Sequence, residues 1–294
     1  MMNDLYTPLA SSCTQQVDIR GLNHTIHTWG KPTNPSIFLL HGWMDNGQTF
    51  QFLADSLADN WYLISPDLRG FGTTAQTPYG YWFPDYLADF EALLNIYAPK
   101  QTARIVGHSM GGNIACLYAG IRPNRISHLV SLESVGLPNA EPSLAPERYA
   151  DWLDQWQAVA RFSEHTIDQL TSRVLSLGPH MSHSQARFIA ETWSAPAIED
   201  KRTLLSDPRH KYLNPTLYRR EEARSCWRQI EAKAMLITGS ESNISCSPEL
   251  QNCQRDFKEC IPPLIEKRIP DADHMVHWDQ PKRVADSIES FLRL

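Results

Sequence analysis

A serine between glycines stands at a junction typical of covalent hydrolytic catalysis. Residues 107–112 read Gly-His-Ser-Met-Gly-Gly, after an apolar β-branched run at 103–107 and before a helix-forming segment at 110–121. Flanking glycines between a strand and a helix permit a sharp turn that lifts the serine hydroxyl clear of the sheet. The helix N-terminus also presents free N–H groups beside developing negative charge. We therefore predict that Ser109 is a nucleophile rather than part of a simple tight turn.

A glycine after a second strand can complete the site that such a serine needs. The buried strand predicted at 36–40 is followed by His41, Gly42 and Trp43. Because glycine has no side chain, the backbone there can approach a reacting carbonyl closely. The N–H groups of Trp43 and Met110 are therefore predicted to form an oxyanion hole, with His41 and Gly42 in the substrate pocket. The alternative is an ordinary strand-to-loop turn around a buried histidine.

A histidine near the C-terminus supplies the candidate general base. His274 follows a strand predicted near 264–269 and precedes a helix predicted at 281–294. A loop at the C-terminal edge of a parallel sheet can carry such a histidine to a serine on a neighbouring strand. His277, three residues later, is the competing candidate, and we favour His274.

The order of the predicted elements indicates how these groups are brought together. Short apolar strands alternate with amphipathic helices up to about residue 136 and again from about residue 233. This alternation is typical of a parallel sheet built from strand-helix-strand units. The segment between them is rich in proline and aromatic residues, and it predicts helices without strands. We expect an α/β core domain made of 1–136 and 233–294, interrupted by a helical cap at 137–232.

These motifs together resemble the α/β-hydrolase fold superfamily. Leu-His-Gly-Trp at 40–43, Pro-Asp-Leu-Arg-Gly-Phe-Gly at 66–72, the serine motif at 106–112 and Asp-His at 273–274 occur in the order of that superfamily. Within it, the chain looks like bacterial serine hydrolases of carboxylesterase type with a helical cap, related to the serine-hydrolase-like proteins. The resemblance implies an eight-stranded, mostly parallel sheet flanked by helices. It also implies a cap inserted after the sixth strand and an active site between cap and sheet.

The acid of the expected catalytic triad departs from the usual pattern of the family. Members typically carry an aspartate three residues after the glycine that closes the seventh strand, and here that position is Ser242. The nearest carboxylate is Glu241, one position earlier. Another subset of the family takes its acid from the end of the sixth strand, where this chain has Glu133. A carboxylate in either place can accept the second N–H of the imidazole and hold its tautomer. We favour Glu133 and keep Glu241 as the alternative.

The expected activity is that of a serine hydrolase that cleaves carboxylic esters through an acyl-enzyme intermediate. A serine nucleophile sets the chain apart from relatives that attack with a carboxylate. Three cap tryptophans, Trp152, Trp156 and Trp193, are expected to line the substrate pocket, although packing of the cap against the core is the alternative for each. A C–C bond hydrolase or a thioester hydrolase would use the same triad. A protein that kept the fold for ligand binding and lost turnover is a rival from another class.

Composition narrows the possible partners. The 294 residues have 42% hydrophobic side chains and a formal net charge of −6, which is typical of a globular protein and gives no basic footprint for nucleic acid. Neither a secretory signal nor a membrane-spanning run is recognisable. The six cysteines lack metal-type spacing and are expected to be reduced, as in a cytoplasmic protein. We expect a monomer or homodimer acting on a small ester or acyl substrate, with no metal or other cofactor.

Overall fold

The chain folds around one eight-stranded sheet. The structure is a computed structural model that describes residues 5–157, 161–196 and 199–294. The strands are β1 (Cys13–Ile19), β2 (Leu22–Trp29), β3 (Ser36–Leu40), β4 (Tyr62–Pro66), β5 (Ala103–His108), β6 (Ile126–Leu132), β9 (Lys233–Gly239) and β10 (Leu264–Ile269). Their order across the sheet is β1-β2-β4-β3-β5-β6-β9-β10. Only the pairings of β2 with β1 and with β4 are antiparallel, so the mostly parallel eight-stranded sheet expected from the resemblance is confirmed.

The central strands are apolar because both of their faces are covered. Residues 37–40 of β3 are completely buried, as expected for a parallel strand with helices on each side. The edge strand β1 is mostly exposed and carries polar residues instead. The carboxyl ends of β3, β5 and β6 therefore lie side by side in the middle of the sheet, where β3 and β6 both pair with β5.

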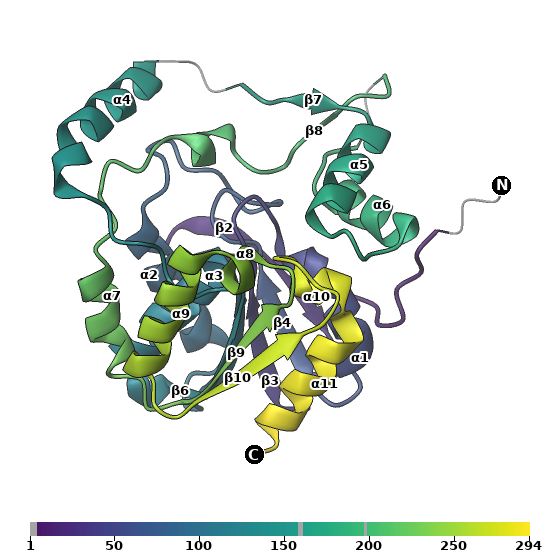
Figure 1. The fold of residues 1–294 in the computed structure, drawn as a ribbon. Coiled ribbons are helices and arrows are strands. Elements are labelled where there is room, and N and C mark those ends of the chain that lie inside the picture. The colour runs from purple at the N-terminus through teal and green to yellow at the C-terminus, as the bar shows by residue number, and fades with distance from the viewer. Residues whose placement is uncertain (1–4, 158–160, 197–198) are drawn as a thin grey trace.

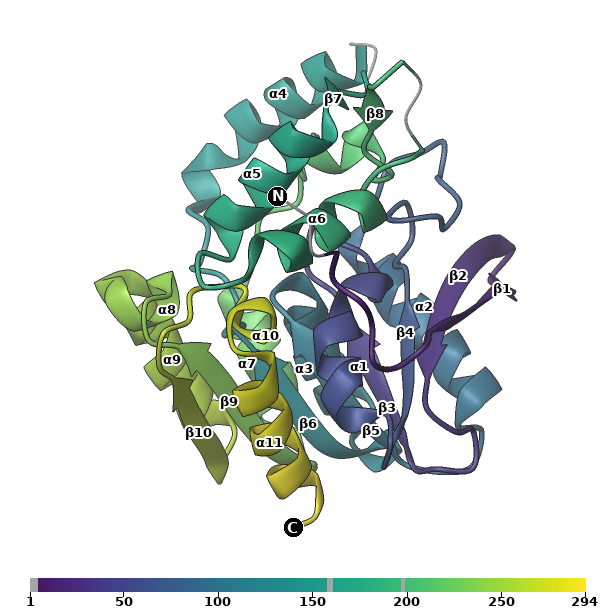
Figure 2. The same ribbon diagram turned by 90° about the vertical axis from the view of Figure 1, so that its right-hand side faces the viewer.

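Helices cover both faces of the sheet (Figures 1 and 2). Four of them, α2 (Phe83–Tyr97), α3 (Met110–Ile121), α7 (Arg220–Trp227) and α9 (Pro248–Cys260), contribute to the apolar core on one face. On the other face, a second core contains residues of α1 (Gln51–Leu57), α10 (Val276–Asp279) and α11 (Pro281–Leu292). The short helix α8 (Asn243–Cys246) precedes α9. Within the described ranges, no helix is long and apolar enough to cross a membrane.

A cap lies over the carboxyl ends of the strands. In both views, α4 (Ala145–Gln157), α5 (Ile167–Leu177) and α6 (His183–Thr192) stand above the sheet (Figures 1 and 2). Helices α5 and α6 each begin with a capping box, in which a Thr or Ser at the N-cap exchanges hydrogen bonds with a Gln three residues later. A third apolar cluster joins this pair of helices to Phe52 of α1 and Trp278 of α10.

Two features of the segment 137–232 differ from the sequence expectation. The cap contains a small antiparallel pair, β7 (Glu164–His165) with β8 (Arg202–Thr203), where only helices were predicted. The helix α7 packs against α3 and α9 rather than over the strand ends, and its Trp227 is 1% exposed and meets Phe257 of α9 edge to face. Its apolar side thus completes the core beneath α3, and the expected division at residue 232 places too much chain in the cap.

Candidate active site

The turn between β5 and α3 holds Ser109 in a strained conformation. Its backbone has φ 50° and ψ −114°, which is a costly geometry for a residue with a side chain, by about 1–3 kcal/mol. The neighbouring glycines have no room for a side chain, since a Cβ on Gly111 would overlap the carbonyl of Leu40 and one on Gly107 would overlap Gly111. The Ser109 N–H donates to the carbonyl of Leu132 at 2.9 Å. The turn therefore has the close packing and the strain of a nucleophile elbow.

Glu133 lies beneath His274. It follows β6 with φ 52°, and its carboxylate is buried. One oxygen, Oε1, accepts the N–H of Gly239 at 2.5 Å, and the other, Oε2, lies 3.5 Å from Nδ1 of His274. The side chain of His274 is 47% exposed, whereas that of Glu133 is fully buried. A buried carboxylate thus faces one ring nitrogen of a histidine whose ring is half exposed.

His108 connects the loop of His274 to the elbow. The Nε2–H of His108 donates to the carbonyl of His274 at 2.9 Å, and the two rings lie 4.9 Å apart. This bond assigns the proton of the neutral His108 ring to Nε2 and leaves Nδ1 as an acceptor. Because His108 immediately precedes Ser109, the bond ties the loop of His274 to the turn that carries the serine.

Glu241, the alternative acid, is placed elsewhere. It is half exposed, and its Oε2 accepts from Nε2 of His180 at 2.9 Å. His180 belongs to the connection between α5 and α6, so this pair joins the cap to the loop after β9. The structure therefore brings Glu133, and not Glu241, to His274.

His277, the alternative base, is buried beside His108. Its side chain is 1% exposed, and its ring lies 4.5 Å from that of His108 and 5.1 Å from that of Phe50. Burial lowers the pKa of His277 to about 3. A ring enclosed in this way is not on the surface that a substrate reaches, so the geometry favours His274 as the base.

A cavity of about 210 Å³ separates the cap from the core beside the elbow. Trp43 and Met110, the predicted oxyanion residues, both line it, together with Trp152 and Trp156 of α4. Met110 is the first residue of α3, where backbone N–H groups lack helical acceptors. Further aromatic lining comes from the loop before α2, which sequence reasoning missed although its run Tyr-Gly-Tyr-Trp-Phe at 79–83 was visible.

Three residues expected in the substrate pocket lie outside this cavity. His41 is completely buried, with Nδ1–H donating to the Gly42 carbonyl at 2.7 Å and Nε2 accepting from the Leu68 N–H at 2.9 Å. Trp193 is in the apolar cluster of α5 and α6, and its indole N–H donates to Asp45 at 2.8 Å. Gly42 abuts the ring of His108, where an added Cβ would come within 2.8 Å of Nδ1. These three residues therefore pack behind the cavity wall and do not line the substrate pocket.

The ring of His210 anchors the cap segment against the core. It is stacked between Phe71 and Tyr81, with ring centroids 3.6 Å from each, and its backbone carbonyl accepts from the Trp43 indole at 3.3 Å. The Tyr81 hydroxyl donates to Asp207 at 2.6 Å. These contacts hold one wall of the cavity in place.

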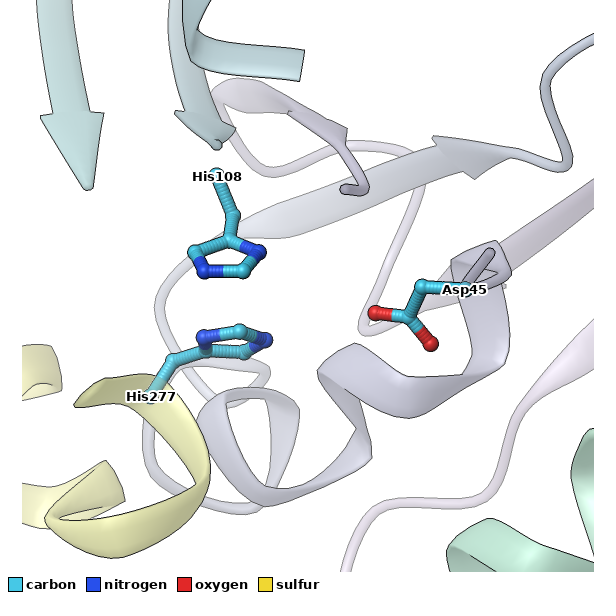
Figure 3. Close-up of side chains that lie close together, drawn as sticks. All are labelled: Asp45, His108 and His277. Carbon is cyan, nitrogen blue, oxygen red and sulfur yellow. The ribbon is translucent and has the colours of Figure 1, made fainter. Parts of the chain in front are cut away.

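Asp45, His108 and His277 form a buried group of ligand-type side chains behind the elbow (Figure 3). Their potential ligand atoms all lie within 4.8 Å of one another. From the sequence we expect no metal, and no motif signals this group because its members come from three distant segments.

The fold is that of the α/β class of hydrolases. Residues 35–281 match the model of the alpha/beta hydrolase fold family, so the chain belongs to that family. It is 25% identical to a serine hydrolase-like protein of Danio rerio over 274 residues, which cover 90% of this chain and 83% of the relative. It is 29% identical to a probable serine hydrolase of Drosophila melanogaster, with the same coverages.

A solved structure shares the same fold. The thioesterase domain from the curacin biosynthetic pathway superposes with a TM-score of 0.85 at 21% identity, covering 95% of this chain and 99% of that domain. The expected fold and the expected likeness to serine-hydrolase-like proteins are thus confirmed.

The ion pair between His180 and Glu241 is expected to make the stability of the fold depend on pH. The hydrogen bond to Glu241 raises the pKa of His180 above its ordinary value. The pair therefore adds stability that is fully present below the ordinary pKa of histidine. This stability is lost as the pH rises through the raised pKa of His180. We expect His180→Asn to lower the free energy of unfolding at pH 6.0 by no more than about 1 kcal/mol, because the pair is solvent-exposed, and to change it less at pH 8.5. Urea unfolding at the two pH values measures this; an equal loss at both would contradict it.

Proposed function

We propose that the protein is a serine hydrolase that cleaves carboxylic esters with Ser109, His274 and Glu133. The observation that carries the proposal is the buried carboxylate of Glu133 facing Nδ1 of His274, on a loop bonded to the residue before a strained serine. In this mechanism Glu133 accepts the Nδ1–H of His274, which leaves Nε2 free to take a proton from the serine hydroxyl.

The reaction proceeds through two tetrahedral intermediates. As His274 takes its proton, the Ser109 oxygen attacks the ester carbonyl, and the resulting oxyanion is bound by the N–H groups of Trp43 and Met110. The alcohol leaves with the proton from His274, and an acyl group remains on Ser109. Water then attacks this acyl-enzyme, giving its proton to His274, and the acid is released as the serine is restored.

The cavity supports a substrate of modest size. Its volume of about 210 Å³ is below the 300–1,000 Å³ that is usual for sites of drug-sized ligands. Its walls are mostly aromatic, and the two proposed oxyanion residues lie on them. We infer that a short apolar acyl or alkyl group fills the cavity.

All six cysteines are free, as is usual in reducing compartments, so we place the activity in the cytoplasm.

Two measurements test the proposed function. A fluorophosphonate probe should label the protein stoichiometrically, with the mass increase on the peptide that contains Ser109. Hydrolysis of p-nitrophenyl esters from acetate to decanoate should be fastest for the short chains. A thioester of the same acyl group, assayed in parallel, tests the alternative suggested by the thioesterase neighbour. Absence of both labelling and turnover would contradict the proposed serine hydrolase and favour the alternative of a ligand-binding protein without catalysis.

Trp156 is expected to set the chain-length limit. It lines the cavity from α4 and approaches the core loop at Gly80. We expect Trp156→Ala to lengthen the cavity and to raise kcat/KM for decanoate relative to acetate by about tenfold, which corresponds to about 1.4 kcal/mol. The matched control is Tyr149→Ala, on the same helix but half exposed and outside the cavity lining. An unchanged chain-length profile in Trp156→Ala would place the acyl group elsewhere.

A further inference from the structure

Three ligand-type side chains converge in a closed space beneath the elbow. Asp45, His108 and His277 are 4%, 1% and 1% exposed. Figure 3 shows the two imidazole rings facing each other, with the carboxylate of Asp45 to one side of both. Their ligand atoms lie within 4.8 Å of one another. Two histidines and one aspartate in one buried space form a donor set that suits a divalent transition metal.

Three of the four imidazole nitrogens of this group lack hydrogen-bond partners among the residues that the structure describes. The Nδ1 of His108 has no hydrogen-bond partner there. It is the unprotonated nitrogen of the ring, since the proton on Nε2 is donated to the carbonyl of His274. Neither nitrogen of His277 has one. A buried polar atom without a partner is costly. Nearby His41 shows the contrast, since both of its nitrogens are hydrogen-bonded.

Asp45 is oriented for this role by its own hydrogen bonds. Its Oδ1 accepts the indole N–H of Trp193 at 2.8 Å, and its Oδ2 accepts the hydroxyl of Thr49 at 2.9 Å. The backbone N–H of Asn46 also bonds to this carboxylate. A carboxylate has about four lone-pair positions, so room remains for one further ligand. Such outer partners are the usual means by which proteins fix the direction of a metal ligand.

We propose that Asp45, His108 and His277 bind one zinc-like divalent ion in a buried site behind the active site. Zinc takes imidazole nitrogen and carboxylate oxygen at about 2.0–2.2 Å, so the three ligand atoms draw together on binding. The ion would be coordinated by Nδ1 of His108, one nitrogen of His277 and one oxygen of Asp45. The ion takes part in no step of the proposed hydrolysis.

The positions of the three ligands explain what such an ion would do. His108 directly precedes Ser109, His277 follows His274 by three residues, and Asp45 follows Trp43 by two. One ion would therefore connect the segments that carry the proposed nucleophile, base and oxyanion donor. This role rests on the proposed function, but binding of the ion does not, because it depends only on the three buried ligands.

Metal binding is tested directly on the tag-free, full-length protein. The native protein is incubated with Co²⁺ or Zn²⁺ and dialysed, and its metal content is measured by mass spectrometry. We expect one equivalent, with the visible absorption of low-symmetry Co²⁺ and a rise in Tm of about 5 °C. Asp45→Asn and His277→Gln are each expected to weaken Co²⁺ binding at least tenfold while keeping the circular dichroism of the wild type. The control His180→Gln, which removes an exposed histidine, should bind as the wild type does.

The outcomes separate this proposal from the proposed function. Failure to retain metal, or binding that persists unchanged in both Asp45→Asn and His277→Gln, overturns the site. Binding that is lost in both variants supports it, whichever ester the enzyme cleaves. Labelling of Ser109 by the fluorophosphonate is an independent readout, since it reports the nucleophile and not the ion.

Discussion

Ser109→Ala is expected to lower kcat for p-nitrophenyl acetate by a factor of roughly 10⁴ to 10⁶, the range in which loss of a serine nucleophile falls. The variant keeps the cavity and the N–H groups proposed for the oxyanion hole but cannot form an acyl-enzyme. Fluorophosphonate labelling should disappear in parallel. Turnover within tenfold of the wild type would show that Ser109 is not the nucleophile.

Ser109→Gly provides a control that separates catalysis from folding. Glycine adopts φ 50° with little strain, whereas serine holds that conformation at a cost. We therefore expect Ser109→Gly to be as inactive as Ser109→Ala but more stable than the wild type by about 1 kcal/mol. Urea unfolding measures the difference. A glycine variant less stable than the wild type would contradict the idea that the elbow stores strain for function.

Glu133→Gln is expected to lower kcat by about 10⁴, as the equivalent amide replacement does in a serine protease triad. The amide oxygen can still accept the N–H of Gly239, so its NH₂ group then faces His274. An NH₂ donor there selects the His274 tautomer with the proton on Nε2, which cannot take a proton from Ser109. KM should change little, because Glu133 is buried and does not line the cavity.

Glu241→Gln is the matched control for this prediction. It removes a carboxylate from the loop after β9 but affects only the exposed pair with His180. We expect its kcat to stay within a few-fold of the wild type. The reverse result, with Glu241→Gln inactive and Glu133→Gln active, would mean that the loop after β9 rearranges during catalysis to supply the acid.

The sequence could not decide which glutamate is the acid of the proposed triad. Glu133 and Glu241 each follow a strand at the same edge of the sheet, and their side chains are chemically identical. Which one meets His274 depends on the backbone after each strand. Glu133 has a positive φ and a buried carboxylate, whereas Glu241 is directed to solvent and to His180 of the cap. These directions follow from long-range packing that no local pattern records.

Which residues line the pocket also could not be read from the sequence. Trp152, Trp156 and Trp193 were equivalent as cap aromatics in the sequence, yet the first two line the cavity and the third is buried against Asp45. His41 lay beside a predicted oxyanion residue, but both of its ring nitrogens are occupied by the backbone. The aromatic loop at 79–83 became part of the wall only through its contact with the cap.

The sequence by itself determined an α/β core and the candidacy of Ser109 and His274 from strand and helix periodicity and from turns of a few residues, and the resemblance of its ordered motifs to the superfamily indicated the α/β-hydrolase fold. Only the tertiary structure decided the partner of His274, the residues around the cavity and the meeting of Asp45, His108 and His277. The physical reason is distance along the chain. Glycines and apolar periodicity act locally, whereas a carboxylate or an imidazole acquires its role from neighbours that strand order and cap packing bring to it.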